Sequence, residues 1–189
     1  EYDGKRIAYD IGLANMLLNH ITQKIGLSYD NNGMLARKGV INMDMLKQLN
    51  NLSYYELPYP KSTGYEWFVE KVAPIVNATE DTTENLLHTA VHHICEQVAM
   101  QIKTNAKKDH STLLVTGGGA LNTFMMELLQ SYLEPLVNLV IPDKKLLEDK
   151  EALIFALRGV LRVEQEINVL KSVTGASTDS SSGVVYLPS

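Results

Sequence analysis

TLLVTGGGALN, residues 112–122, is the stretch of this sequence that decides the fold. Its first five residues form a short apolar run of the kind found in buried strands. Three glycines follow, and beyond them apolar residues recur at the spacing of one helix face, at Met125, Leu128, Leu129 and Leu133. The stretch therefore predicts a strand over residues 112–116, a tight glycine bend and a helix beginning directly after it.

Strands and helices alternate on both sides of this stretch. KRIAYD (residues 5–10) and LVNLVI (136–141) are predicted as two further strands, and residues 184–187 as a last extended piece. Helices are predicted over residues 13–26, 43–50, 66–76, 82–107 and 149–163, the first and the fourth from apolar residues at helical spacing. Gly26 suits the end of the first of these helices, and Pro74 marks the end of the third. This alternation predicts an α/β fold with three or more strands, parallel at least in part, and flanking helices.

The composition is that of an ordinary globular protein, and it narrows the classes of partner. Of 189 residues, 45% are hydrophobic and 21% are charged, and the net charge is −5. A negative chain with interspersed charges gives no electrostatic basis for binding nucleic acid or a membrane surface. The single cysteine, Cys95, excludes an internal disulfide and fits a reducing, cytoplasmic setting. No apolar run is long enough to cross a bilayer.

The glycine bend formed by Gly117, Gly118 and Gly119 is the best local indication of a ligand site. Glycines let the backbone approach a ligand closely and adopt positive φ. The N-terminus of the next helix presents unpaired N–H groups and the positive end of its dipole. One interpretation is a nucleotide contact. The other is a tight strand–helix turn whose glycines only allow close packing, because the spacing matches neither a dinucleotide fingerprint nor a P-loop.

DIGLAN, residues 10–15, is a second turn between a predicted strand and a predicted helix. Asp10 could orient a metal-bound water or a phosphate, and Asn15 could bond a ligand oxygen. The alternative, which the residues alone favour, is that Asp10 caps the following helix.

PKSTG, residues 60–64, places a cation and two hydroxyls on one loop. Lys61 could neutralise phosphate charge there. A solvated turn with a helix cap at Ser62 or Thr63 explains the same residues.

Three histidines and the cysteine gather in the helix predicted over residues 82–107. His88 and His92 are one helical turn apart, which suits metal ligation, and His93 and Cys95 lie close by. Zinc would need further ligands, and the sequence has no second Cys/His cluster. Ordinary helix residues are the favoured interpretation, so no metal site is predicted.

Five segments, taken in this order, resemble the anhydro-N-acetylmuramic acid kinase family. They are YDIGLANMLLN (residues 9–19), YPKSTGYEWF (59–68), LLVTGGGALNTFMMELL (113–129), DKEALIFA (149–156) and SVTGAS (172–177). The resemblance spans nearly the whole chain and implies the C-terminal half of an actin-like ATPase (ribonuclease H-like) domain. A helical insertion would occupy about residues 29–80, and the N-terminal domain would lie outside this chain.

The resemblance also implies an activity for the complete protein. It would be a bacterial, ATP-dependent kinase that uses Mg²⁺ and acts in the cytoplasm during peptidoglycan recycling. It would open the ring of 1,6-anhydro-N-acetylmuramic acid by hydrolysis and form N-acetylmuramic acid 6-phosphate. Its partners would be ATP, the small-molecule sugar and a second copy in a homodimer, with neither nucleic acid nor a membrane involved.

Carried over position by position, the resemblance assigns roles to individual residues. The nucleotide-binding positions are Gly117, Gly118, Gly119, Asn122, Asp10, Gly12 and Asn15. Glu151, which would lie in the first turn of the helix predicted over 149–163, is expected to touch the sugar. Lys61, Ser62 and Thr63 are expected to line the cleft. The catalytic base is expected in the N-terminal part, so the chain contains no predicted catalytic residue and should be inactive alone.

The sequence departs from the family pattern beside Asp10. Ile11, Leu13 and Ala14 stand where the family usually has Thr, Pro and Gly, which removes a hydroxyl that could contact a phosphate. Two other functions stay open. One is a non-catalytic nucleotide- or sugar-sensing module on the actin-like fold, and the other is an actin-like kinase of a different sugar.

Overall fold

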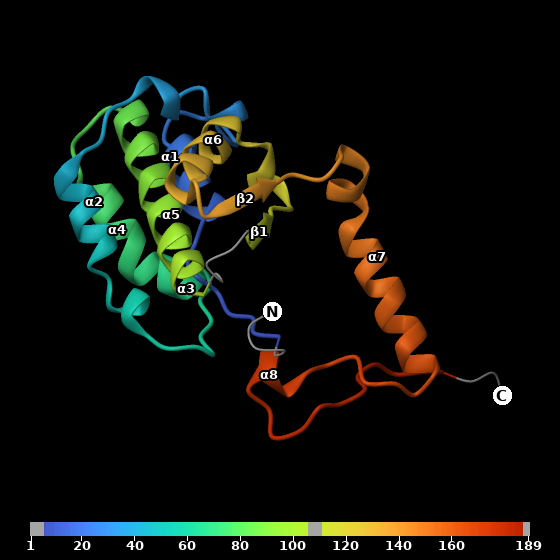
Figure 1. Ribbon diagram of the computed structural model, residues 1–189. Helices are drawn as coiled ribbons and strands as arrows, with labels where there is room; N and C mark the ends of the chain where they lie inside the picture. Colours follow the sequence, from blue (N-terminus) through green and yellow to red (C-terminus); the bar gives the residue numbers. More distant parts are fainter. Residues whose placement is uncertain (1–5, 106–110, 187–189) are drawn as a thin grey trace. The chain divides into compact units, whose positions relative to one another are not determined.

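A computed structural model describes residues 6–105 and 111–186 of the chain (Figure 1). The chain divides into two compact units. The larger, which we call the main unit, comprises Asp10–Leu57 and Ser62–Pro142. The smaller, which we call the small unit, comprises Pro58–Lys61 and the described parts of Glu1–Tyr9 and Asp143–Ser189. The glycine bend and the loop from Asp10 to Asn15 both belong to the main unit.

The main unit is built around one long helix, α5 (Thr83–Asn105), which contacts α1, α2 and α6 (Figure 1). Its inward face is mostly apolar and includes the buried residues Leu87 and Val91, but it also buries the polar side chains of Thr89, His93 and Gln97. Thr82 caps the helix, because its hydroxyl accepts from the Asn85 N–H at 3.2 Å. The helix predicted over residues 82–107 is confirmed from residue 83 to 105, and residues 106–107 lie outside the described part.

The first helix, α1 (Asn15–Gln23), begins two residues later than predicted and buries Leu17 and Ile21. Gly26 closes it in the left-handed region, with φ 76°. The N–H of Leu27 then donates back to the Thr22 carbonyl at 3.1 Å, as in other helices that end on a left-handed glycine. The role predicted for Gly26 is confirmed.

Short 3₁₀ turns and one further helix continue the chain. The turns η1 (Asn31–Gly33) and η2 (Ala36–Lys38) precede α2 (Met43–Asn50), and η3 (Ser53–Glu56) follows it. The bounds of α2 are those predicted. Asn42 starts this helix, since its side-chain oxygen accepts from the Met45 N–H at 3.0 Å.

The helical segment that begins after Gly64 is longer than predicted. It runs through α3 (Tyr65–Trp67), the π-helical turn η4 (Phe68–Val72) and α4 (Ala73–Ala78). The prediction that Pro74 ends this helix is wrong. Pro74 is the second residue of α4, which directly follows the π-helical turn η4, where the backbone does not form the i−4 hydrogen bond that a proline disrupts in an α-helix, and the helical segment continues to Ala78.

Within the described residues the sheet has two strands, β1 (Ser111–Leu114) and β2 (Val137–Val140). They pair in parallel, with Ser111 opposite Val137 and Leu114 opposite Val140. The connection between them contains α6 (Thr123–Leu133), which buries Leu129 and Leu133. The two central strands, their parallel pairing and the helix between them are therefore confirmed.

The prediction of a third strand, KRIAYD, is wrong for residues 6–10, which have no regular structure. A short run that mixes polar and apolar residues is compatible with a strand, but a strand also needs a neighbour to pair its N–H and C=O groups. In the part of the chain that the structure describes, the sheet consists of β1 and β2 alone. Residues 184–186 are likewise irregular. The remaining residues of these two predictions, 5 and 187, lie outside the described ranges.

The small unit contains α7 (Lys144–Val163), α8 (Lys171–Thr174) and an antiparallel bridge between Val169 and Ser180. Helix α7 begins earlier than predicted, because Asp143 caps it by accepting from the Leu146 N–H at 2.9 Å. Glu151 therefore lies well inside α7, and its predicted place in a first turn is wrong. Among the described residues, no helix combines the length and the apolar character needed to cross a membrane.

Candidate functional site

The glycine bend follows β1 directly. Val115 extends the parallel pairing beyond the strand, since its N–H donates to the Val140 carbonyl at 2.9 Å. Gly117 then adopts φ 81°, a left-handed backbone that other residues adopt only with strain. A single 3₁₀ turn, η5 (Gly118–Leu121), comes before α6. The helix therefore begins one turn after the glycines, later than predicted.

Asn15, the first residue of α1, lies against this bend. A Cβ placed on Gly118 would be 3.3 Å from Asn15 Nδ2, and one placed on Gly119 would be 3.7 Å from Asn15 Oδ1. The same Cβ on Gly119 would lie 3.2 Å from Met125 Cε. The structure thus brings together two motifs that are about a hundred residues apart in the sequence, and the glycines allow their close approach.

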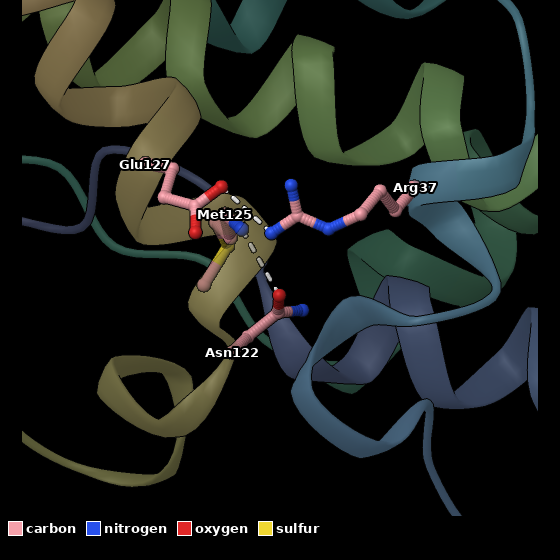
Figure 2. Close-up of polar contacts among 4 residues, drawn as sticks. All are labelled: Arg37, Asn122, Met125 and Glu127. Atoms are coloured by element: carbon pink, nitrogen blue, oxygen red, sulfur yellow. Dashed lines mark hydrogen bonds and ion pairs between the residues drawn. The ribbon is translucent and has the colours of Figure 1, made fainter.

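Asn122 is the N-cap of α6 and is 9% exposed. Its side-chain oxygen accepts from the Met125 N–H at 3.0 Å (Figure 2). Gly33 packs directly on this carboxamide, because a Cβ on Gly33 would lie 2.3 Å from Asn122 Oδ1 and 2.7 Å from Phe124 Cβ. The side-chain oxygen of Asn122 is therefore used to cap α6, and its NH₂ group can donate a hydrogen bond to a ligand.

A pocket of about 360 Å³ opens beside the bend. We call it the asparagine pocket, and its lining comprises Asn15, Leu18, Asn19, Tyr29, Asp30, Asn31, Asn32, Gly118, Leu121 and Asn122. Five of these residues are asparagines, whose carboxamides offer both donors and acceptors. Two leucines add apolar contact. Carboxamide groups next to apolar side chains suit a flat polar ring such as a purine base, which has hydrogen-bonding edges and apolar faces.

Residues 29–32 are not among the site residues predicted from the sequence, and neither are Leu18, Asn19 and Leu121. Asp30 holds the segment in place, because its carboxylate accepts from the backbone N–H groups of Leu35 and Ala36, each at 2.9 Å. The sequence signal is a turn-rich run ending in Gly33. A turn-rich run predicts a turn but no ligand site. Residues 29–32 become one wall of the pocket because η1 packs against α6 in the folded chain.

An ion pair also joins η2 to α6 next to the Asn122 cap (Figure 2). Arg37 donates to Glu127 at 2.7 Å, and its guanidinium lies 5.1 Å from the centre of the Phe124 ring. Both charged side chains are about half exposed, so the pair stabilises the fold only weakly. Its geometric effect is to link the segment before α2 to the helix that follows the glycine bend.

Asp10 does not cap α1, so that alternative is wrong. Ala14 holds the cap position, where no side chain bonds the helix. Asp10 Oδ2 instead accepts from Ser62 Oγ at 2.9 Å and from the Thr63 N–H at 3.0 Å. The helix cap proposed for Ser62 or Thr63 is also wrong, since Gly64 holds the cap position of α3. Asp10, Ser62 and Thr63 therefore form one polar cluster in the main unit.

The three residues that depart from the family pattern are partly buried. Leu13 and Ala14 pack against the hydrophobic core of the main unit, which is compatible with apolar side chains at both positions. Lys61 and Glu151 belong to the small unit. Burial lowers the pKa of Lys61, and Glu151 is exposed on α7. In the main unit the structure brings Asn15 together with Gly118 and Gly119 and, as a second group, Asp10 together with Ser62 and Thr63.

The histidines and the cysteine of α5 bond to neighbouring protein groups. His88 Nδ1 bonds the Ala36 carbonyl at 2.8 Å, and His92 Nδ1 bonds the Tyr132 hydroxyl at 3.0 Å. Burial raises the pKa of Cys95 to about 12, with a smaller contribution from Glu96. Over the described ranges, no three His, Cys, Asp or Glu side chains are grouped so that they could hold a metal ion.

Comparisons with known proteins point to one family. The profile of the anhydro-N-acetylmuramic acid kinase family matches residues 2–188. The chain is 38% identical over 192 residues to an anhydro-N-acetylmuramic acid kinase of Aliivibrio fischeri, covering 97% of this chain and 51% of that relative. A Vibrio cholerae protein of the same name is 34% identical over 195 residues, covering 98% and 51%. The chain thus spans about half the length of the curated relatives it matches, and it belongs to the anhydro-N-acetylmuramic acid kinase family.

Proposed function

We propose that the complete protein containing this chain is an ATP-dependent kinase of 1,6-anhydro-N-acetylmuramic acid, acting in the cytoplasm during peptidoglycan recycling. Water adds to the anomeric carbon of the sugar, the bond from that carbon to O6 breaks, and O6 takes the γ-phosphoryl group of ATP. The products are N-acetylmuramic acid 6-phosphate and ADP. The base that takes the proton of the water is expected outside this chain, in the other half of the protein.

The observation that carries the proposal is the contact between Asn15 and the glycine bend beside the asparagine pocket. A volume of about 360 Å³ lies within the usual range for small-molecule sites, about 300–1,000 Å³. In the proposed complex the purine base enters this pocket. The phosphates run past Gly117, Gly118 and Gly119, where the absence of side chains lets the backbone approach them.

Asp10 is proposed to lie next to the phosphates of ATP and to hold the Mg²⁺ ion that they bind. The carboxylate is exposed, and both of its hydrogen bonds within the described residues go to Oδ2. Mg²⁺ in phosphoryl-transfer sites is typically held by one or two carboxylates together with phosphate oxygens, so an exposed aspartate fits the ion. When bound, the ion neutralises phosphate charge. Ser62 and Thr63 fix the carboxylate in one orientation.

Three further assignments complete the proposal. Gly12 is the close-approach position in the loop from Asp10 to Asn15. Glu151 contacts the sugar. Lys61, Ser62 and Thr63 are proposed to line the cleft, where the Lys61 side chain would neutralise phosphate charge. The homodimer implied by the family resemblance belongs to the same proposal.

The experiment that tests the proposal uses the complete protein, ATP and the anhydro sugar. We expect ADP and the 6-phosphate sugar in equal amounts, and an Asn15→Ala protein with a KM for ATP raised about 10-fold through loss of its hydrogen bonds. Asn51→Ala is the matched control, because Asn51 is exposed at the end of α2 and lines no part of the asparagine pocket. We expect no turnover from the 189-residue chain by itself.

Each alternative function gives a different result in this assay. ATP binding without sugar phosphorylation would indicate a sensing module. Turnover of another sugar in preference to the anhydro sugar would indicate a different kinase on the same fold. Turnover by the isolated chain would contradict the assignment of the base to the other half of the protein.

A further inference from the structure

Two consecutive tyrosines of η3 reach the loop that begins at Asp10. Tyr54 donates its hydroxyl hydrogen to the Asp10 carbonyl at 2.6 Å. Tyr55 places its ring against Gly12, because a Cβ on Gly12 would lie 3.0 Å from Tyr55 Cε1 and 3.1 Å from its hydroxyl oxygen. Trp67 packs on both rings, with centroid separations of 4.9 and 6.1 Å. The loop is therefore held at two adjacent points by one aromatic segment.

The ring of Tyr55 is in turn anchored on α5. Its hydroxyl lies 2.8 Å from His93 Nε2, and His93 Nδ1 lies 2.6 Å from Asn50 Oδ1. The same Asn50 oxygen accepts from the Gln97 amide at 3.0 Å, while Asn50 Nδ2 donates to Glu96 at 2.8 Å. Helices α2 and α5 and the aromatic segment thus share one hydrogen-bonded network.

The direction of each bond follows from the Glu96 carboxylate, which can only accept. Asn50 must therefore turn its NH₂ group to Glu96 and its oxygen to His93. An oxygen accepts, so His93 carries its proton on Nδ1 and its Nε2 accepts from the Tyr55 hydroxyl. Burial lowers the pKa of His93 to about 4 and raises that of Tyr55, so both groups stay neutral and the bond keeps its direction near neutral pH.

We propose that Tyr55 is a positioning residue for the loop from Asp10 to Asn15, and that His93 and Asn50 hold its ring against Gly12. This inference rests on the proposed function in so far as that loop faces the nucleotide phosphates. The alignment of Asp10 and Asn15 with the ligand then depends on a hydroxyl group that touches neither the nucleotide nor the sugar.

The chain contains a matched control for this hydroxyl. Tyr132 lies in the same network and donates to Glu96 at 3.0 Å, but it is on α6. It lines neither the asparagine pocket nor a second, small cavity whose lining includes Gly12, Tyr55 and His93. Tyr55→Phe and Tyr132→Phe each remove one phenolic hydroxyl from one network. A purely structural role for Tyr55 would give the two variants the same properties.

The first measurement needs no nucleotide. Gly12→Ala is introduced into the complete protein, into Tyr55→Phe and into Tyr132→Phe, and urea unfolding of all variants is compared. We expect the effect of Gly12→Ala on the unfolding equilibrium constant to be about 5-fold smaller in the Tyr55→Phe protein, because an unanchored ring can move away from the added methyl. Its effect in the Tyr132→Phe protein should equal that in the wild type. Equal effects in all three would overturn the proposal.

The second measurement is the KM for ATP and the kcat of the single variants. We expect Tyr55→Phe to raise the KM about 5-fold, the size of one lost hydrogen bond, while Tyr132→Phe stays within about 2-fold of wild type. A Tyr55→Phe protein that keeps the wild-type KM and kcat would overturn the positioning role even if the unfolding data showed coupling. A wild-type protein without ATP-dependent turnover would instead refute the proposed function, and the unfolding data would then decide whether Tyr55 holds the loop.

Discussion

Gly33→Ala should destabilise the protein and weaken nucleotide binding, because Gly33 packs on the residue that caps α6. Its φ of 70° would cost an alanine about 1–2 kcal/mol. The added Cβ would also lie 2.3 Å from Asn122 Oδ1, so the carboxamide must leave its bond to the Met125 N–H. Loss of such a cap costs about 1 kcal/mol. The combined effect on the free energy of unfolding is about 2–3 kcal/mol.

Gly26→Ala is the control that separates these two contributions. Gly26 has nearly the same φ, 76°, but a Cβ there would meet nothing within 4 Å. It should therefore show the backbone cost alone, and the Gly33→Ala protein should be less stable by a further ~1 kcal/mol in urea unfolding of the complete protein. In an Asn122→Ala background, Gly33→Ala should lower the free energy of unfolding by ~1 kcal/mol less than it does in the wild type, because the cap has already been removed.

The affinity for ATP supplies the second readout for Gly33→Ala. Asn122 lines the asparagine pocket, so its displacement should raise the Kd for ATP by about 10-fold, while Gly26→Ala leaves the Kd unchanged. Equal destabilisation by Gly33→Ala and Gly26→Ala would refute the reasoning that Gly33 supports the cap.

Three further predictions concern protonation, thiol reactivity and a surface ion pair. Burial lowers the pKa of His93 in the folded protein to about 4, so between about pH 4 and pH 6.5 the unfolded chain binds a proton that the folded protein does not. The free energy of unfolding should therefore be highest above about pH 6.5 and should fall by ~3 kcal/mol as the pH is lowered toward 4. Urea unfolding of His93→Gln between those pH values should show a flatter dependence. Cys95 is buried with a raised pKa, so a maleimide at pH 8 should label the native protein far more slowly than the urea-unfolded protein. A double-mutant cycle on Arg37 and Glu127 should give a coupling below about 1 kcal/mol, since both side chains are half exposed.

The sequence predicts those parts of the fold that depend on local pattern. The apolar periodicity of α1 and α5 and the two short apolar runs of β1 and β2 give the right elements at nearly the right residues. The two failures have different causes, one a missing tertiary partner and the other a local helix geometry. KRIAYD has a strand-like pattern, but residues 6–10 have no neighbouring strand among the described residues. The sequence predicts that Pro74 ends a helix, but a π-helical turn precedes it and the helix continues.

The candidate site shows the same division. The glycine bend and the loop from Asp10 to Asn15 are visible as motifs, yet their contact through Asn15 appears only in the folded chain. Residues 29–32 show only a turn signal in the sequence, although they form one wall of the asparagine pocket. The anchoring of Tyr55 on His93 joins positions 38 apart in the sequence, and no periodic pattern encodes such a pair.

The central claim is that the asparagine pocket and the glycine bend hold ATP. A crystal structure of the complete protein with a non-hydrolysable ATP analogue tests it most directly. We predict the purine ring between Asn15 and residues 29–32, with the phosphates beside Gly117, Gly118 and Gly119. A nucleotide bound elsewhere, with this pocket filled by protein side chains, would contradict the account.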